Sequence, residues 1–179
     1  MSTGLFALLK DVSVIAKTAA ASLDDVAAAS VKATSKAAGV VIDDAAVTPK
    51  YVVGFAAERE IPIVRSIALG SLKNKFFYIL PSALILGFFI PWLIHPILLI
   101  GGLYLSYEGA EKILSYMKGE ASKESVKDEQ ETIKSATRTD FILSAEIMAL
   151  ALSTVQEMSI TNQFLTLSVV AFVITFLVY

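Results

Sequence analysis

Uncharged stretches dominate the chain after residue 75, and the longest of them covers residues 76–107. Each charge at the centre of a bilayer costs about 2.5–3.5 kcal/mol, so a run of this length is typical of a membrane protein. One span needs about 20 residues, which makes the run too long for one simple helix. Pro91 and Pro96 interrupt it, and proline removes an amide donor and restricts the preceding residue. The pattern therefore predicts a hairpin over residues 74–108, with its turn at these prolines.

Two further apolar segments follow the hairpin, over residues 141–157 and 163–179. Glu146 interrupts the first segment, and a polar turn beginning near Gln156 separates the two. The second segment is uncharged as far as Tyr179 and has no basic flank after it. This ending is typical of a truncated chain or of an isolated first half.

The first sixty residues have a different character, since they are rich in Ala and carry charges at helical spacing. An apolar stripe beginning at Leu5 predicts one helix. A second helix is expected from Ser22, which opens a pattern resembling a capping box, to Gly39, a plausible stop. These faces are too weakly apolar to span a bilayer, so the helices are expected to pack together, on the membrane surface or against the transmembrane bundle.

The chain is therefore expected to divide into an Ala-rich cytoplasmic or membrane-surface region, 1–62, and a transmembrane region, 63–179. A further helix is expected to run through 63–75, where small residues suit close helix packing. The predicted fold class is all-α: a polytopic membrane protein with about four transmembrane or membrane-buried helices behind an Ala-rich helical region.

Composition narrows the range of functions. The chain has 179 residues, is 55% hydrophobic and carries a formal net charge of −2, which excludes a broad basic surface for nucleic acid. There is no cysteine and one histidine, so thiol catalysis and zinc sites built on Cys or His are excluded. No motif predicts an enzyme or a cofactor. Because the basic residues flank the hairpin, the positive-inside rule predicts that the N-terminus and the charged loop 112–138 are cytoplasmic.

Carboxylates inside apolar segments are the candidate site residues. Glu146 is the sharpest, because an intramembrane carboxylate usually faces a bundle interior or a water-filled cavity. It is expected either to bind a cation or proton, to be a protonated side chain bonded to a neighbouring helix, or to lie near water in a shallow segment. Asp140 lies six residues earlier, about 600° around a helix, so the two carboxylates project on opposing sides and cannot chelate one ion. Asp140 is expected to be an interfacial cap.

Acidic pairs elsewhere have two readings. Glu108 and Glu111 form an i,i+3 pair that suits a hard-cation entry site, but Glu108 and Lys112 also suit a solvated salt bridge, which we favour. The doublets at Asp24, Asp25, Asp43 and Asp44 suit Mg²⁺, Ca²⁺ or Mn²⁺ if they converge, and they also suit helix starts, which we favour.

Several short sequence segments along the chain resemble those of an uncharacterised bacterial inner-membrane family, that of YedI. They are LDDVA (23–27), AGV (38–40), DDAAV (43–47), REIPIV (59–64), GSLKNK (70–75), PW (91–92), GGLYL (101–105), YEGAEK (107–112) and TDFILSAEI (139–147). The resemblance covers nearly the whole chain, in order. It implies a location in the bacterial inner membrane and a family whose members are typically longer, but no established function.

A second, weaker resemblance is to TerC-type transporters, which are linked to metal-ion export. The words IGGLY (100–104) and EK (111–112) are similar to the end of one of their helices. The word DFILSAE (140–146) is similar to their acidic D-x-x-x-S-x-D helix, with Glu in place of the last Asp.

Two hypotheses of function follow. The first is a transporter of a cation or small solute, in contact with the lipid bilayer and with a divalent cation or proton, that uses Glu146. The second is a non-transporting scaffold that acts through its cytoplasmic helices. Four spans are few for enclosing a pathway, so a homo-oligomer is plausible if the chain is complete.

Overall fold

The structure is a computed structural model that describes residues 3–117 and 128–179, and every regular element in these ranges is helical. The elements in chain order are α1 (Thr3–Val47), the 3₁₀ turn η1 (Thr48–Tyr51), α2 (Ala57–Asn74), the π-helical turn η2 (Lys75–Ile79), α3 (Leu80–Phe89), the 3₁₀ turn η3 (Pro91–Leu93), α4 (Ile94–Met117), α5 (Glu129–Ser153) and α6 (Ile160–Val178). The all-α class is confirmed.

Helix α1 is one continuous helix of 45 residues, so the predicted pair of helices is wrong. Ala is the strongest helix former, and the Ala-rich run outweighs the cost of Gly39, which is about 1 kcal/mol in a helix interior. Ser22 is not a cap; its hydroxyl donates instead to Asn162 Oδ1 of α6, at 3.2 Å. The doublets at Asp24 and Asp43 therefore lie inside a helix and cap no helix start.

Helices α2 and α3 run on from one another through η2, and the first of them begins at Ala57, earlier than expected, with Pro62 inside it. In η2 the Leu80 amide donates to the Lys75 carbonyl, five residues back. Pro81 follows at once and has no amide to donate, and a wide π turn next to it accommodates the gap in the helical ladder. The bulge therefore has a local cause in the sequence.

The chain reverses at Ile90 and η3, next to the first of the two predicted prolines. Pro96 does not break the following helix. It lies in the first turn of α4, where a proline costs no intrahelical hydrogen bond. Helix α4 therefore begins at Ile94, three residues before the expected position.

Helix α5 extends further toward the N-terminus than the predicted apolar segment. Asp128 caps it by accepting a 3.1 Å hydrogen bond from the Gln130 amide, so residues 129–138 of the predicted charged loop are helical. Residues 118–127 of that loop lie outside the described ranges. The helix continues past Glu146 to Ser153, and a short turn leads to α6, which Ser159 caps.

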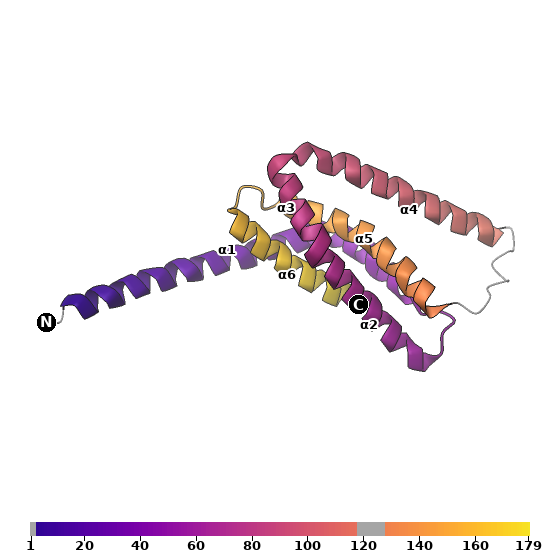
Figure 1. Ribbon diagram of the computed structural model, residues 1–179, viewed down its shortest axis with the longest axis horizontal. Helices are drawn as coiled ribbons and strands as arrows, with labels where there is room; N and C mark the ends of the chain where they lie inside the picture. Colours follow the sequence, from indigo (N-terminus) through magenta and orange to yellow (C-terminus); the bar gives the residue numbers. More distant parts are fainter. Residues whose placement is uncertain (1–2, 118–127) are drawn as a thin grey trace.

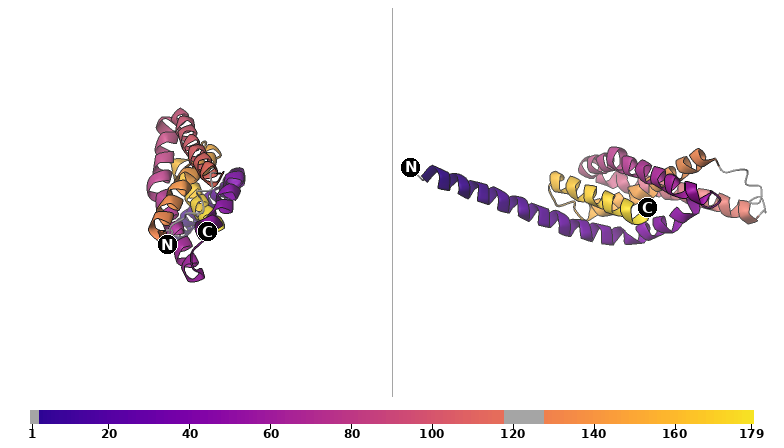
Figure 2. Two further views of the ribbon diagram at one scale, coloured as in Figure 1. Left: turned by 90° about the vertical axis from the view of Figure 1, so that its right-hand side faces the viewer. Right: turned by 90° about the horizontal axis from the view of Figure 1, so that it is seen from below.

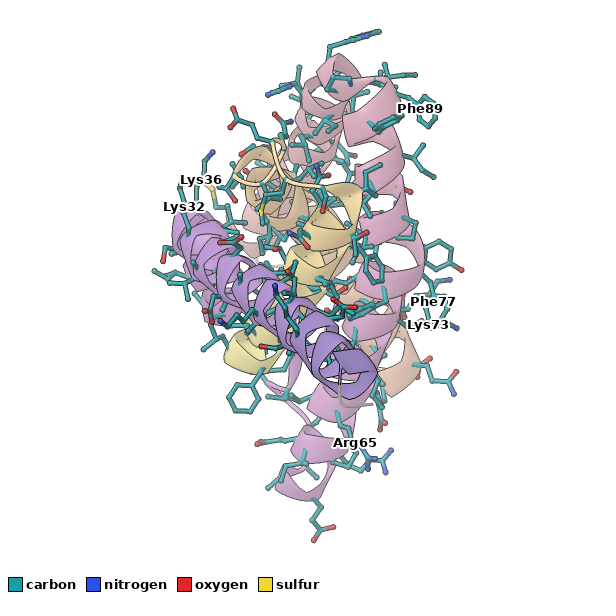
Figure 3. The ribbon with its side chains drawn as sticks, turned by 90° about the vertical axis from the view of Figure 1, so that its left-hand side faces the viewer. Lys32, Lys36, Arg65, Lys73, Phe77 and Phe89 are labelled. Atoms are coloured by element: carbon teal, nitrogen blue, oxygen red, sulfur yellow. The ribbon has the colours of Figure 1, made fainter. Side chains whose placement is uncertain are left out.

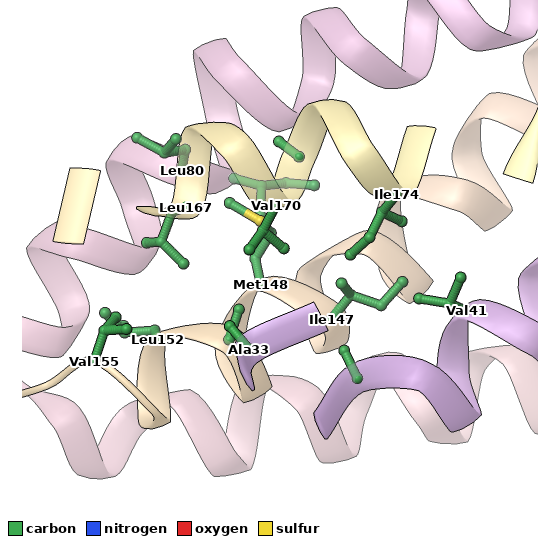
Figure 4. Packing of buried hydrophobic residues seen from close by; sticks show 14 of the residues in the cluster. Ala33, Val41, Leu80, Ile147, Met148, Leu152, Val155, Leu167, Val170 and Ile174 are labelled. Carbon is green, nitrogen blue, oxygen red and sulfur yellow. The ribbon is translucent and has the colours of Figure 1, made fainter. Parts of the chain in front are cut away.

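The core lies where α5 and α6 meet the C-terminal half of α1 and the start of α3. Figure 4 shows Met148 and Ile147 of α5 among Val170 and Ile174 of α6, with Ala33 and Val41 of α1 closing one side. Alanines on α1 let its backbone approach these helices closely. Of the three placements expected for this region, the structure shows its second half packed against the bundle.

The N-terminal half of α1 projects away from the other helices (Figures 1 and 2). Its contacts with α6 begin near Ser22, at the start of α6, and Asp44 lies close enough to Tyr179 to act on it electrostatically at the other end. The two helices therefore run side by side in the same direction. The described side chains of residues 10–21, the part of α1 just before Ser22, are all exposed.

Two helical stretches, Ala57–Phe89 and Ile160–Val178, are long and apolar enough to cross a membrane. The outer faces of the bundle carry large apolar side chains, among them Phe77, Phe89 and Phe176, the last 85% exposed. Figure 3 shows Phe77 and Phe89 on the side opposite Lys32 and Lys36 of α1. Lys73, which is also exposed, lies beside Phe77 in this view, so exposed aromatic side chains and a basic residue share this side of the bundle.

Candidate buried charge network

A fully buried ion pair joins Lys75 to Asp140, with 3.3 Å between Lys75 Nζ and Asp140 Oδ1. Both side chains have no exposed surface. Removing an ion from water costs several kcal/mol even after relaxation, so such a pair persists only when opposite charge and hydrogen bonds surround it. The network around this pair supplies both.

Three groups share the same carboxylate oxygen. The Ser71 hydroxyl donates to Asp140 Oδ1 at 2.9 Å, and the Tyr179 hydroxyl donates to it at 2.9 Å. Lys75 also donates to the Ser71 hydroxyl, one helical turn before it. Asp140 is therefore held by groups from η2, α2 and the end of α6, and it ties these elements together at one level of the bundle.

Asp44 of α1 is the unusual member of the network. It has no exposed surface, and within the part of the chain that the structure describes neither of its carboxyl oxygens accepts a hydrogen bond. Burial raises the pKa of Asp44 from 3.8 to about 7; the charge of Asp140 also raises it, and that of Lys75 lowers it. Near neutral pH this carboxyl therefore exchanges a proton with small changes in its surroundings.

Two small polar side chains outside the network are buried among apolar residues. Ser144 lies one turn after Asp140 on the buried face of α5, and Thr166 lies on the buried face of α6. Among the described residues, neither hydroxyl has a hydrogen-bond partner, and the same is true of the second oxygen, Oδ2, of Asp140. Buried polar groups normally have partners, so each of these three atoms is a point at which a proton, an ion or water could bind.

Local sequence explains why the network forms at this level. Lys75 and Asp140 are the last charged residues before the apolar stretches of α3 and α5, and Ser71 and Lys75 are spaced i,i+4 on one helix face. Where α2 and α5 lie side by side, a Cβ on Gly70 would be 3.1 Å from Thr137 Cγ2. The absent side chain at Gly70 brings these helices close enough for the ion pair to be buried.

The structure corrects the expected role of Asp140. It is not an interfacial cap, because it lies in the middle of α5, fully buried, and Asp128 caps the helix instead. Glu146 is exposed on the same helix. The two carboxylates therefore face different ways, as their spacing predicted, and the role of Glu146 stays a prediction.

The other candidates whose side chains are described, apart from Asp44, lie outside the network. Glu111, Asp24 and Asp25 are exposed, and the side chains of Glu108 and Asp43 lie outside the described set. Among the doublet residues with described side chains, Asp44 is the one that contributes. Within the described ranges no three His, Cys, Asp or Glu side chains come together in a way that could hold a metal ion.

Sequence reasoning missed three members of the network, Lys75, Ser71 and Tyr179. Lys73 and Lys75 both come directly before the apolar run 76–107, and the structure shows Lys73 exposed and Lys75 buried. One sequence feature could have indicated the pair, because Lys75 and Asp140 are each the last charged residue before an apolar run. Nothing in the sequence pairs Tyr179 with a carboxylate 39 residues earlier.

Comparison with known proteins gives one match. The model of the family described as "Protein of unknown function (DUF808)", which is the family of YedI, matches residues 3–179. No curated protein and no solved structure matches the chain. The resemblance to TerC-type transporters therefore stays a prediction. Since the match covers nearly the whole chain, the protein belongs to the DUF808 family.

Proposed function

We propose that this chain is a polytopic membrane protein of the bacterial inner membrane that moves protons, alone or together with a solute, through the network of Asp44, Lys75 and Asp140. The observation that carries the proposal is the fully buried Asp44 carboxyl, which accepts no hydrogen bond from a described group and lies within electrostatic range of a buried ion pair. Ionisable groups inside membrane proteins commonly mark proton relays and ion pathways.

Charge balance favours the proton over a divalent cation. With all three groups ionised, the network carries one net negative charge, and protonation of Asp44 makes it neutral. A divalent cation would leave it with a net positive charge, in surroundings where both ions of the Lys75–Asp140 pair have no exposed surface. Hard cations such as Ca²⁺ prefer six to eight oxygen ligands, and the described carboxylates offer two carboxyl groups here.

The test is proton flux into proteoliposomes that contain the purified protein, measured with an internal pH dye under an imposed pH gradient. D140N and D44N are expected to lower the flux at least tenfold, while D25N, an exposed Asp on the same helix α1, leaves it unchanged. Flux that survives in D44N and D140N would end the proposal. E146Q in the same assay tests the separate hypothesis that Glu146 lies on the pathway.

A scaffold is the second candidate, and the projecting half of α1 favours it. Val12, Val14 and Ile15 are each more than half exposed on a helix that touches no other described element there. A helix of this kind is available for binding a partner. Deleting residues 3–20 is then expected to abolish an interaction in cells while leaving flux intact, whereas loss of flux alone would favour transport.

A further inference from the structure

We propose that the cleft between α3, α4 and α5 binds one anionic phospholipid, with the acyl chain between the helices and the headgroup on Lys134 and Arg138. The proposal rests on the membrane location within the proposed function, and not on proton movement. An anionic lipid matches the cleft because the cleft joins an apolar part to a cationic end.

The apolar part is a cavity of about 300 Å³. Its walls come from Ile79, Ala83 and Leu86 on one side and Ile97 and Leu98 on the other. Ala145 and Ala149 of α5 form the floor, and their small side chains leave the space open. Among the lining residues only Tyr78 and Ser82 carry polar side chains, so the cavity suits a hydrocarbon chain and no polar solute.

The cationic end is a second hollow that shares Phe141 with the first. Asn74, Lys134, Thr137 and Arg138 line it, with no Asp or Glu among its lining residues. The guanidinium carbon of Arg138 lies 4.6 Å from the centroid of the Tyr104 ring on α4, a cation–π contact that holds Arg138 at the mouth of the cleft. Basic pockets between membrane helices are typical sites for anionic headgroups.

The residue spacing along α5 places the cationic end and the apolar part of the cleft one after the other along the same helix face. Lys134, Arg138, Phe141, Ala145 and Ala149 follow at steps of three or four residues, so they share one face of the helix. From Lys134 to Ala149 the rise is about 22 Å at 1.5 Å per residue. One leaflet, half of the 40–45 Å bilayer, has about the same thickness, so one lipid would fit the stripe from headgroup to chain end.

The test is native mass spectrometry and thermal unfolding of the purified protein in mild detergent, titrated with phosphatidylglycerol or with phosphatidylcholine. We expect one phosphatidylglycerol to stay bound and to raise the unfolding temperature more than phosphatidylcholine does. The variant K134Q/R138Q is expected to lower the affinity for phosphatidylglycerol at least tenfold and to leave that for phosphatidylcholine unchanged. A149F fills the cavity and is expected to lower both.

The matched control is K32Q/K36Q, which removes two exposed lysines of α1 (Figure 3) that are not among the residues lining the cleft. Equal binding of the two lipids, equal losses in K32Q/K36Q and K134Q/R138Q, or a dimer that covers the cleft and excludes lipid would each overturn the proposal. Because this assay needs no transport, its failure is separate from a loss of proton flux.

Discussion

Lys75 and Asp140 form an ion pair with no exposed surface, 65 residues apart in the chain and 3.3 Å apart in space. Removing one partner would leave the other charge buried and uncompensated. K75M or D140L alone is therefore expected to lower the free energy of unfolding by about 3–5 kcal/mol. The double variant K75M/D140L removes both charges and is expected to recover most of that loss. Denaturant unfolding in detergent, followed by helical signal, measures all three.

If the double variant is no more stable than the less stable single variant, the two side chains contribute to stability through packing and not through charge compensation. R59A offers a surface comparison. Arg59 forms an exposed bidentate pair with Glu129, and its loss is expected to cost less than about 1 kcal/mol.

Asp44 makes stability depend on pH. Its folded pKa, about 7, lies above its ordinary value of 3.8, so between these values the folded state holds a proton that the unfolded state has lost. Stability is then full below about pH 4 and falls as pH rises toward 7, by at most about 1.4 kcal/mol per pH unit. D44N is expected to remove this slope. Melting temperatures of the unmodified protein and of D44N between pH 5 and pH 8 test this pH dependence. The same slope in both proteins would contradict the assignment to Asp44.

Two glycines of the hairpin are expected to respond differently to alanine. A Cβ on Gly87 would lie 2.7 Å from Cδ2 of the buried Leu152, whereas a Cβ on Gly102 would meet nothing within 4 Å. G87A is therefore expected to destabilise by about 1–3 kcal/mol through overpacking. G102A is expected to be neutral or to stabilise by up to about 1 kcal/mol, because Ala favours a helix. Thermal unfolding of the two variants, measured under the same conditions, tests this difference.

The proposed membrane location and orientation are open to a direct test, because the chain has no cysteine. W92C, at the hairpin turn, is expected to react with a membrane-impermeant maleimide in intact cells. E120C, in the predicted cytoplasmic loop, is expected to react only after the cells are opened. The reverse pattern would place the N-terminus outside the cell.

Hydrophobic pattern predicted the α-helical class, the reversal at Pro91 and the polar turn before α6, because these depend on local composition. It failed where long-range packing overrides local signals. Ser22 and Gly39 resemble helix boundaries when the sequence is considered alone. In the structure, the contacts of α1 with α5 and α6 stabilise one continuous helix across both positions. Asp140 looks like a cap only until Lys75 is known to lie beside it, and that contact joins two distant segments.

The unbroken length of α1 has a mechanical consequence. Its 45 residues make a rod about 67 Å long, with Asp44 near one end, buried beside the ion pair, and the other end free of the bundle. An α-helix without a break transmits a push or a turn along its axis. We therefore expect that a load applied to the free end, by a partner or by the bilayer, would shift the position of Asp44 and change how tightly it holds its proton.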